Sequence, residues 1–305
     1  IAPASAATIA RLAQGQADEL LACQALAFRG KAVIAPAMNP AMWSHPATQA
    51  NIATLRERGC AVVEPGCGRT ACGEEGQGRL ADLREIYLAG LRALAPQDME
   101  GIRVMVTLGP TREHWDGLRF WTNPSTGTMG AAVAVAAWLR GARVEAVCGP
   151  GTPWLPAGIA RHMLEAAASV WPQCDAGVFT AAVADFSPVP PVQGGDKKFK
   201  KSDAPDGFDV HFAPNPDILK TLAADRRPDQ KVVGFAAESQ NLEDSVRGKL
   251  VSKKADMVVG NLLQDGFGTP DNTVFVADAS GREERWAHLS KTDVAWRLLS
   301  WLLSR

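Results

Sequence analysis

The sequence predicts an α/β protein in which a smaller domain precedes a doubly wound, mainly parallel sheet. The first observation is that short apolar runs, rich in β-branched residues, alternate with helical segments along the chain. The second is that glycine-bearing loops join the run at 102–108 to an alanine-rich helix at 129–139. The third is the length of 305 residues, which exceeds the usual size of one domain.

The first domain is expected to span residues 1–97. Its pattern predicts helices at 6–26, 48–58 and 83–95 and short strands at 32–35 and 61–64. The glycine-rich stretch 66–79 is expected to form a mobile flap rather than a packed element. Polar residues at 96–101 indicate a linker, which places the domain boundary near Asp98.

The second domain, residues 98–305, repeats the alternation of strands and helices. We expect strands at 102–108, 143–148, 177–180, 231–235 and 257–259, helices at 129–139, 159–170, 216–224 and 292–303, and a hairpin of 273–277 with 284–288. Prolines, glycines and charges between Ser187 and Gly207 indicate a long functional loop or a partly disordered one.

The segment from Gly109 to Gly130 carries the strongest functional signal. It starts at the carboxyl end of a predicted strand, where open α/β sheets bind ligands, and ends in the first turn of a helix, where unpaired N–H groups favour a phosphate. Gly127 and Gly130 would let the backbone approach an anion closely. Together with Gly109 and Ser125 they form the predicted phosphate loop, although the same glycines also suit a plain tight connection.

Polar side chains crowd this segment and favour the ligand interpretation over the plain connection. Asn123 can both donate and accept hydrogen bonds, which suits an oxyanion or an acyl phosphate intermediate. The other polar residues are Arg112, Glu113, Asp116, Arg119 and Ser125.

Composition argues against several classes of protein. The net charge of −1 argues against a nucleic-acid partner. We see neither a signal peptide nor an apolar run long enough to span a membrane, so a cytoplasmic location is expected. The six cysteines lack the paired spacing of a disulfide framework or a zinc site. We expect small buried side chains at Cys23, Cys60, Cys148 and Cys174, whereas Cys72 lies in the predicted flap.

Further motifs occur in a definite order after the glycine loops. They are Ala181-Ala-Val-Ala-Asp185, Lys198-Phe-Lys-Lys201, Asn215-Pro-Asp-Ile218, Gly234-Phe-Ala-Ala-Glu238, and Lys249 and Lys253 before Ala255-Asp-Met-Val-Val-Gly-Asn261. Together with the segment 109–130 they resemble the phosphopantothenate–cysteine ligase family. The resemblance implies a Rossmann-like ligase domain that uses CTP and Mg²⁺.

The resemblance also implies a reaction and its residues. The carboxylate of 4′-phosphopantothenate would attack CTP to give an acyl cytidylate, and the amine of L-cysteine would then displace CMP. Asn123 would contact the acyl cytidylate, Lys198 would contact CTP, and Arg119 is a candidate for the substrate phosphate. The implied CTP site comprises Phe179, Thr180, Ala181, Asp185, Lys198, Pro214, Asn215, Pro216, Asp217, Phe235, Lys249 and Lys253, with Asp185 also the metal ligand.

Three positions depart from the family pattern. Thr128 and Pro214 stand where lysine is usual, and Gly117 stands where proline is usual. Lys249 and Lys253 keep the spacing of one helical turn, so both ammonium groups could reach one triphosphate, but the same spacing also suits an ordinary solvated helix face.

Upstream motifs resemble a second family. Pro36-Ala-Met-Asn39, Ala71-Cys-Gly-Glu74 and Gly78-Arg79 are similar to the flavin-dependent phosphopantothenoylcysteine decarboxylase. This implies a flavodoxin-like domain, FMN as cofactor, and catalytic roles for Asn39 and for Cys72 as proton donor. The sequence starts midway through that flavin domain, and Ala6 replaces a family asparagine. We therefore expect decarboxylation in a full-length parent and not in this truncated domain.

Two other classes of protein stay open. The glycine loop would suit an NAD(P)-dependent Rossmann oxidoreductase, but no Gly-x-Gly-x-x-Gly follows Leu108 and no acidic ribose ligand is well placed. The alternative is a non-catalytic interaction protein on the same scaffold. Members of the ligase and decarboxylase family associate through both domains, so the resemblance implies a homo-oligomer.

Overall fold

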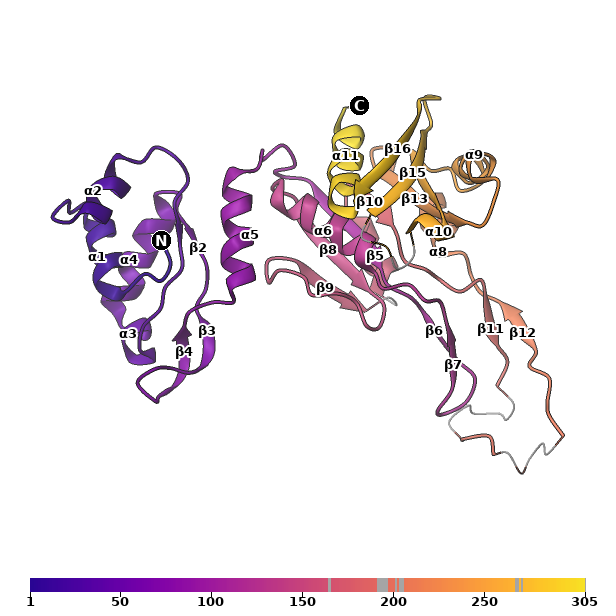
Figure 1. Ribbon diagram of the computed structural model, residues 1–305, viewed down its shortest axis with the longest axis horizontal. Helices are drawn as coiled ribbons and strands as arrows, with labels where there is room; N and C mark the ends of the chain where they lie inside the picture. The colour runs from indigo at the N-terminus through magenta and orange to yellow at the C-terminus, as the bar shows by residue number, and fades with distance from the viewer. Residues whose placement is uncertain are drawn as a thin grey trace. The chain divides into compact units, whose positions relative to one another are not determined.

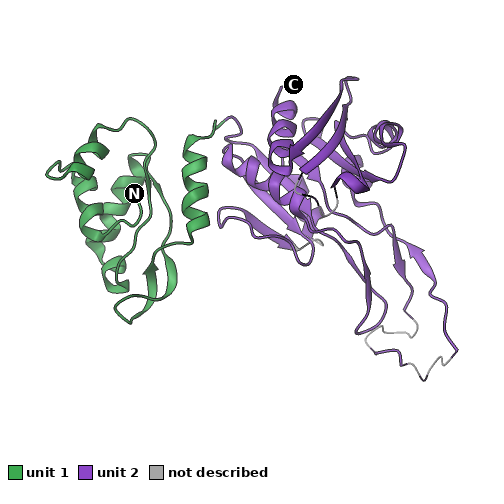
Figure 2. Ribbon diagram, in the orientation of Figure 1, with its two compact units in different colours: residues 1–97 green, residues 98–305 purple. Residues whose placement is uncertain are grey.

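The computed structural model describes residues 1–163, 166–190, 197–200, 202, 206–266, 269 and 271–304. The chain divides into two compact units, residues 1–97 and residues 98–305 (Figure 2). Within the described residues, no helix combines the length and the apolar character needed to cross a bilayer.

Unit 1 is a small helical layer around a two-stranded parallel sheet of β1 and β2. Its core contains Ile9, Ile34, Trp43 and Ile52, contributed by three helices and β1. The elements in order are α1 (Ala6–Gln14), α2 (Leu20–Ala27), β1 (Val33–Ile34), α3 (Pro40–Ser44), α4 (Pro46–Glu57), β2 (Ala61–Val62), β3 (Gly66–Arg69), β4 (Glu75–Arg79) and α5 (Leu83–Leu94).

Three expectations for unit 1 were wrong. The helix expected at 6–26 is two helices, because Gly15 adopts a left-handed φ of 67° and its N–H caps the end of α1. The expected flap is an antiparallel hairpin of β3 and β4. Gly78 allows the hairpin to lie against the segment before α3, since a Cβ there would lie 2.3 Å from the carbonyl oxygen of Met38. Cys23 is exposed, because α2 buries only Ala22.

Unit 2 is built on an eight-stranded sheet with the strand order β16-β15-β14-β13-β10-β5-β8-β9. Its strands are β5 (Arg103–Leu108), β8 (Arg143–Cys148), β9 (Ala160–Met163), β10 (Ala176–Phe179), β13 (Lys231–Glu238), β14 (Met257–Leu262), β15 (Asp271–Asp278) and β16 (Glu283–Ser290). Its helices are α6 (Thr128–Leu139), α7 (Ala167–Val170), the 3₁₀ turn η2 (Trp171–Gln173), α8 (Ile218–Ala224), α9 (Leu242–Ser252), α10 (Leu263–Gly266) and α11 (Lys291–Leu303).

The strand order confirms the predicted doubly wound sheet. The chain moves from β5 to β8 and β9 on one side, then returns to place β10, β13 and β14 on the other side, all parallel. The order reverses between β5 and β10, and the crevice at such a reversal is where open α/β sheets bind ligands. The predicted hairpin is β15 with β16, which extends the sheet antiparallel to β14.

Helices cover both faces of this sheet (Figure 1). Side chains alternate along β5, so Leu108 faces α6, where it lies under Gly130, and Met105 faces the opposite core with α7, α8 and α9. Helix α11 packs beside α6. The central strands are therefore covered on both faces, so a ligand would reach them at their ends and at the loops that follow.

The expected helix at 159–170 was wrong. Residues 160–163 form the edge strand β9, which pairs in parallel with β8, and only Ala167–Val170 is helical; residues 164 and 165 lie outside the described part. Pairing with β8 provides hydrogen bonds for the backbone of residues 160–163 in the sheet. This tertiary contact outweighs the local helix propensity, so the segment is a strand.

Two short hairpins extend from the edge of the sheet at which β5 and β10 end (Figure 1). Strands β6 (Arg112–His114) and β7 (Phe120–Thr122) pair with each other, as do β11 (Phe186–Pro188) and β12 (Phe212–Pro214). Both were missed from the sequence, because three residues are too few to show strand periodicity. The loop expected between Ser187 and Gly207 lies between β11 and β12, and its residues 191–196, 201 and 203–205 are outside the described part.

Gly130→Ala is expected to destabilise unit 2. A Cβ at Gly130 would lie 2.2 Å from Oγ1 of Thr180 and 2.5 Å from Cβ of Leu108, so α6 would have to move off the sheet at a cost of about 1–3 kcal/mol. The matched control is Gly248→Ala in α9, where a Cβ meets nothing within 4 Å and should add up to about 1 kcal/mol of helix stability. Urea unfolding checks the two opposite signs, and equal shifts would contradict the packing role of Gly130.

Candidate functional site

The predicted phosphate loop lies at the reversal of strand order. Gly109 follows β5 with a φ of +88°, and Gly127 caps α6 with a φ of +72°. A Cβ at Gly127 would lie 3.1 Å from the backbone nitrogen of Gly109, so the two loops approach each other backbone to backbone. The hydroxyl of Ser125 accepts a hydrogen bond from the N–H of Gly127 at 3.3 Å.

The glycines of this loop serve packing. Gly127 and Gly130 are both buried, and their missing side chains face protein atoms. Protein atoms fill the space on the side where a Cβ would lie, and the close approach of an anion to the backbone of these two glycines stays a prediction. Thr126 and Thr128 are the exposed residues at this end of α6, and anion binding there stays a prediction.

The loop after β10 is joined to the loop after β5 by hydrogen bonds. Thr180 Oγ1 donates to the carbonyl of Thr107 at 2.6 Å, and the N–H of Ala182 donates to the carbonyl of Gly109 at 2.9 Å. Ala181 N–H donates to Oγ1 of Thr107 at 3.3 Å. The predicted residues Thr180 and Ala181 therefore lie directly at the switch point of the sheet.

Asn123 lies over this loop. Its Nδ2 donates to the carbonyl of Ala182 at 3.0 Å, which fixes which end of the amide carries the nitrogen. One of its two N–H groups is used in this way, so the other can be directed at a ligand. Asn123 follows β7, and the β6–β7 hairpin thus holds it in place.

Asn123 and Asp185 line the same open pocket of about 530 Å³. The aromatic part of its wall comes from Trp121, Phe186 and Phe212, and Trp121 packs edge-on against Phe212 at 5.1 Å. Asp185 is exposed, and its carbonyl accepts from the N–H of Asn215 at 2.8 Å. The remaining lining residues are Thr122 and Ala184.

Asn215 connects the pocket floor to the second hairpin. Its Nδ2 donates to the carbonyl of Ala184 at 2.9 Å, and its Oδ1 accepts from the hydroxyl of Ser187 at 2.6 Å. Pro214 precedes it and pairs with Phe186 across the β11–β12 hairpin, and Pro216 follows it, exposed. These predicted residues are thus held around one edge of the pocket.

Two predicted aromatic contacts differ in burial. Phe179 is buried and packs edge-on against Trp171, with ring centroids 5.9 Å apart. Because β10 is a central strand and turns that ring into the core, the predicted contact with a base stays a prediction for the backbone of Phe179. Phe235 on β13 is half-buried.

The predicted lysines of α9 are each paired with a carboxylate. Lys249 Nζ lies 3.1 Å from Oε1 of Glu238, and Lys253, at the end of α9, contacts Asp217. Asp217 caps α8 by accepting from the N–H of Lys220 at 2.9 Å. Burial raises the pKa of Asp217. The hydrogen bonds from the Lys253 side chain and the Lys220 backbone outweigh this effect and hold the pKa below its usual value. A nucleotide would have to draw the lysines away from these carboxylates.

Lys198 is exposed in the connection between β11 and β12. The lysine motif continues to Lys201, which lies outside the described residues. Phe199 is held on both sides: its N–H donates to Oδ2 of Asp116 at 3.0 Å, and its carbonyl accepts from the guanidinium of Arg119.

Arg119 is engaged within the protein. Its guanidinium lies 2.7 Å from the Asp116 carboxylate and 4.8 Å from the centre of the Trp115 ring. Binding of a substrate phosphate by Arg119 stays a prediction, and such a phosphate would have to share the guanidinium with Asp116.

Among the described residues, no three His, Cys, Asp or Glu side chains converge as a metal site. Asp185 suits Mg²⁺ nonetheless, since Mg²⁺ is usually held by one or two carboxylates and completes its shell with water and substrate phosphates.

In unit 1, the side chains of Asn39 and Cys72 lie side by side, and their catalytic roles stay a prediction. Asn39 caps α3, and its Nδ2 lies 3.3 Å from Cys72 Sγ and 2.8 Å from Glu74 Oε2. Hydrogen bonding by the Thr70 hydroxyl, and then by the Glu74 backbone and Asn39, lowers the pKa of the exposed Cys72 thiol. The hairpin of β3 and β4 holds this cluster, in which Glu74 had no predicted role.

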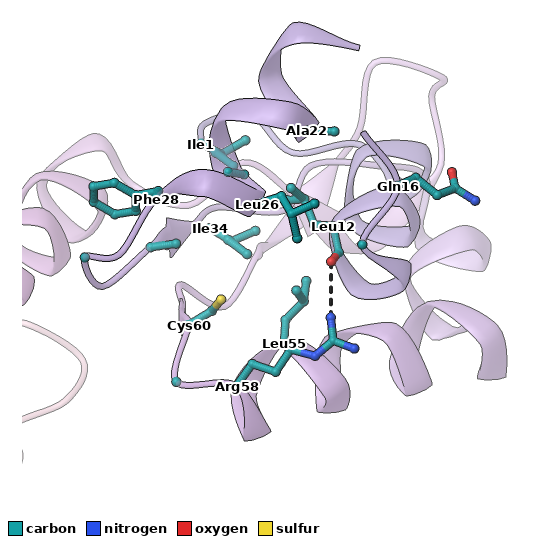
Figure 3. A pocket seen from close by; sticks show the side chains of 15 residues that line it. Ile1, Leu12, Gln16, Ala22, Leu26, Phe28, Ile34, Leu55, Arg58 and Cys60 are labelled. Carbon is teal, nitrogen blue, oxygen red and sulfur yellow. Dashed lines mark hydrogen bonds between the residues drawn. The ribbon is translucent and has the colours of Figure 1, made fainter. Parts of the chain in front are cut away.

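Unit 1 also contains an apolar pocket of about 210 Å³ (Figure 3). Leu12, Leu26, Ile34 and Leu55 point into it, and Arg58 donates across it to the carbonyl of Leu12 at 3.4 Å. None of the predicted site residues lines this pocket.

Comparison with known proteins identifies the family. The pattern of the DNA/pantothenate metabolism flavoprotein C-terminal domain matches residues 99–305, and that of the flavoprotein family matches residues 1–90. The coenzyme A biosynthesis bifunctional protein CoaBC of Bacillus subtilis (strain 168) is 39% identical over 313 residues, covering 98% of this chain and 76% of that protein. This chain belongs to the CoaBC family.

Other relatives and solved structures are similar to this chain. A cysteine/cysteine sulfinic acid decarboxylase from an unknown prokaryotic organism is 35% identical and covers 100% of this chain and 88% of its own. The crystal structure of the C-terminal domain of a CoaBC protein matches with a TM-score of 0.56 at 32% identity, covering 68% of this chain and 97% of its own. The flavoprotein from Streptococcus pneumoniae, at 17% identity and a TM-score of 0.56, shares the fold.

Sequence reasoning gave no supporting role to two carboxylates of the candidate sites: Asp116 was named only as one of several polar residues, and Glu74 only as part of a motif. Asp116 and Glu74 both lie inside motifs that were used, but their partners Phe199 and Asn39 are distant in the sequence. The signal that could have marked Asp116 is a lone carboxylate in a short segment with Trp115, Phe120 and Trp121, since aromatic side chains near it favour burial.

Proposed function

We propose that residues 98–305 catalyse the CTP-dependent ligation of 4′-phosphopantothenate to L-cysteine. The observation that carries the proposal is the pocket in which Asn123 and Asp185 meet at the carboxyl ends of β5 and β10, in a member of the CoaBC family. Membership supports coenzyme A biosynthesis and a ligase role, and the polar groups of the pocket suit a nucleotide-activated acid.

The chemistry proceeds in two steps. A carboxylate oxygen of phosphopantothenate attacks the α-phosphorus of CTP, and pyrophosphate leaves. The amine of cysteine then attacks the acyl carbon, loses a proton, and CMP leaves. We assign to Asn123 a hydrogen bond to the polarised acyl oxygen. The first N–H of its amide donates to the Ala182 carbonyl and holds the amide in place, and the second N–H donates to the acyl oxygen.

Charge balance assigns the other groups. Asp185 would hold Mg²⁺ together with phosphate oxygens, and the metal would offset phosphate charge there. Lys198, Lys249 and Lys253 would add ammonium groups around the triphosphate. The last two must leave Glu238 and Asp217, so we expect nucleotide binding to change these ion pairs.

Measurement of CMP and pyrophosphate release tests the proposal. With CTP and phosphopantothenate alone, we expect at most one equivalent of pyrophosphate per site, and multiple turnovers of CMP only after cysteine is added. CMP release that does not need phosphopantothenate would indicate a simple nucleotide hydrolase. No turnover at all would favour the non-catalytic interaction protein, and a retained nicotinamide nucleotide would favour the oxidoreductase.

We propose that unit 1 contributes to a second activity, the flavin-dependent decarboxylation carried out by a full-length parent protein. The specific observation is the Asn39–Cys72–Glu74 cluster, in which an amide and an exposed thiol of lowered pKa converge. The Asn39 amide can donate a hydrogen bond to a substrate, and the Cys72 thiol suits a proton transfer. They do not suit the phosphate of FMN, because Glu74 is anionic and the cluster contains no cation, so we derive no step through the flavin.

A further inference from the structure

We propose that the Asp116–Arg119 pair positions Lys198 at the nucleotide site by holding the backbone of Phe199. This inference rests on the proposed ligase function. It makes Asp116 and Arg119 positioning residues that act through Lys198, and it gives Arg119 a role other than contact with the substrate phosphate.

The first support is the burial of Asp116. Asp116 is only 1% exposed. Its Oδ1 accepts hydrogen bonds from the N–H groups of Leu118 and Arg119 at 2.8 and 2.6 Å. Oδ2 accepts from Arg119 Nε and from the N–H of Phe199, both at 3.0 Å. A buried carboxylate is costly unless it is paired and hydrogen-bonded, so this one is held by its partners in a single geometry.

The second support is that the backbone N–H and the carbonyl of Phe199 are both hydrogen-bonded to this pair. The N–H goes to Asp116, and the carbonyl accepts from Arg119. The ring is also fixed, because it packs on Trp115 at 5.2 Å and on Phe208 at 5.0 Å, while Trp115 stacks on Phe208 at 4.9 Å. A residue anchored at its backbone and its ring fixes the start of the neighbouring side chain, that of Lys198.

The third support is the position of the pair on the β6–β7 hairpin. Asp116 and Arg119 form the turn of this hairpin, and β7 leads from the turn to Asn123. The same pair therefore connects the strand that carries Asn123 with the segment that carries Lys198. Holding both before CTP arrives reduces the conformational entropy that binding must remove.

Hydrogen exchange tests the anchoring without any substrate. In Asp116→Asn the NH₂ group of the amide can take the place of Oδ2 and oppose the N–H of Phe199. We expect amide exchange at residues 197–200 to become at least about tenfold faster, because the lost acceptor is a charged one, whose hydrogen bond is worth about 1.5–3 kcal/mol. Exchange in β10 should not change. Unchanged exchange at 197–200 would overturn the proposal.

A double-mutant cycle with Lys198→Gln tests the coupling. We expect Asp116→Asn alone to lower kcat/KM for CTP about tenfold to a hundredfold, and the double variant to be no slower than Lys198→Gln alone. If the loss of kcat/KM in the double variant equals the product of the two single losses, Asp116 acts independently of Lys198, and the proposal is overturned. If the wild-type chain releases no CMP, the proposed function fails, and the exchange experiment still decides the anchoring.

Asp278→Asn is the matched control for folding. Asp278 is a buried carboxylate of β15 that accepts from Trp301 Nε1 at 2.7 Å. Its replacement is expected to lower the melting temperature without changing exchange at 197–200, and its effect on CMP release should multiply with that of Lys198→Gln. If the double variant with Asp278→Asn is also no slower than Lys198→Gln alone, a general loss of stability would explain the result for Asp116, and the inference would be overturned.

Discussion

Lys198→Gln is expected to lower the rate of CMP formation by about a hundredfold or more. The substitution keeps a polar side chain that is one atom shorter, and it removes the positive charge. In the proposed reaction negative charge builds up on the phosphates as pyrophosphate leaves, and an ammonium group at Lys198 stabilises that charge. The loss should appear in the first step, measured as pyrophosphate release in a single turnover without cysteine.

The matched control is Lys197→Gln at the neighbouring position. Lys197 is also exposed and lies outside the family motif, so the same change of charge should alter the rate by less than about threefold, as expected for a screened surface charge. Equal losses in the two variants would mean that only the net charge of the segment matters, and would contradict the role assigned to Lys198.

Asn123→Asp is expected to suppress CMP formation by about a hundredfold to a thousandfold, the range for loss of one oxyanion donor. The new carboxylate cannot donate to the acyl oxygen. It also places a negative oxygen in front of the Ala182 carbonyl, which the Asn123 amide now contacts at 3.0 Å. The charge would repel both the incoming phosphopantothenate carboxylate and the phosphates of CTP. Pyrophosphate and CMP should both be measured, because a loss of CMP alone would locate the effect in the second step.

Asn241→Asp provides the control of the same chemical change elsewhere. Asn241 is exposed at the amino end of α9, where a carboxylate is compatible with the helix dipole. Its activity should stay within about twofold of the wild type, as expected for a surface change. Full activity of Asn123→Asp, with this control also active, would remove Asn123 from the site.

Much of the fold could be predicted because its signals are local. The apolar run before Gly109, the alanine-rich helix after Gly127 and the final hairpin were all placed within a few residues of their elements. The region 160–170 could not be predicted in this way. Its alanines suit a helix, but pairing with β8 makes residues 160–163 a strand.

The candidate site shows the same division. Thr180, Ala181, Asn123 and Asp185 were chosen from motifs, and the structure brings them to one edge of the sheet. Phe179 belongs to the same motif, yet its ring is turned into the core. A motif states which residues are adjacent in the chain, whereas the direction of each side chain depends on the face of the strand that carries it.

The sequence by itself determined the doubly wound class of unit 2, the position of the glycine loop after β5, and most of the polar residues gathered there, because periodicity and glycine placement are properties of short segments. Only the tertiary structure decided that Asp116 and Arg119 hold Phe199 beside Lys198, that Lys249 and Lys253 are paired with carboxylates, and that Glu74 orients Asn39. These contacts join residues far apart in the chain, and their energies depend on burial and direction, which a sequence does not contain until it folds.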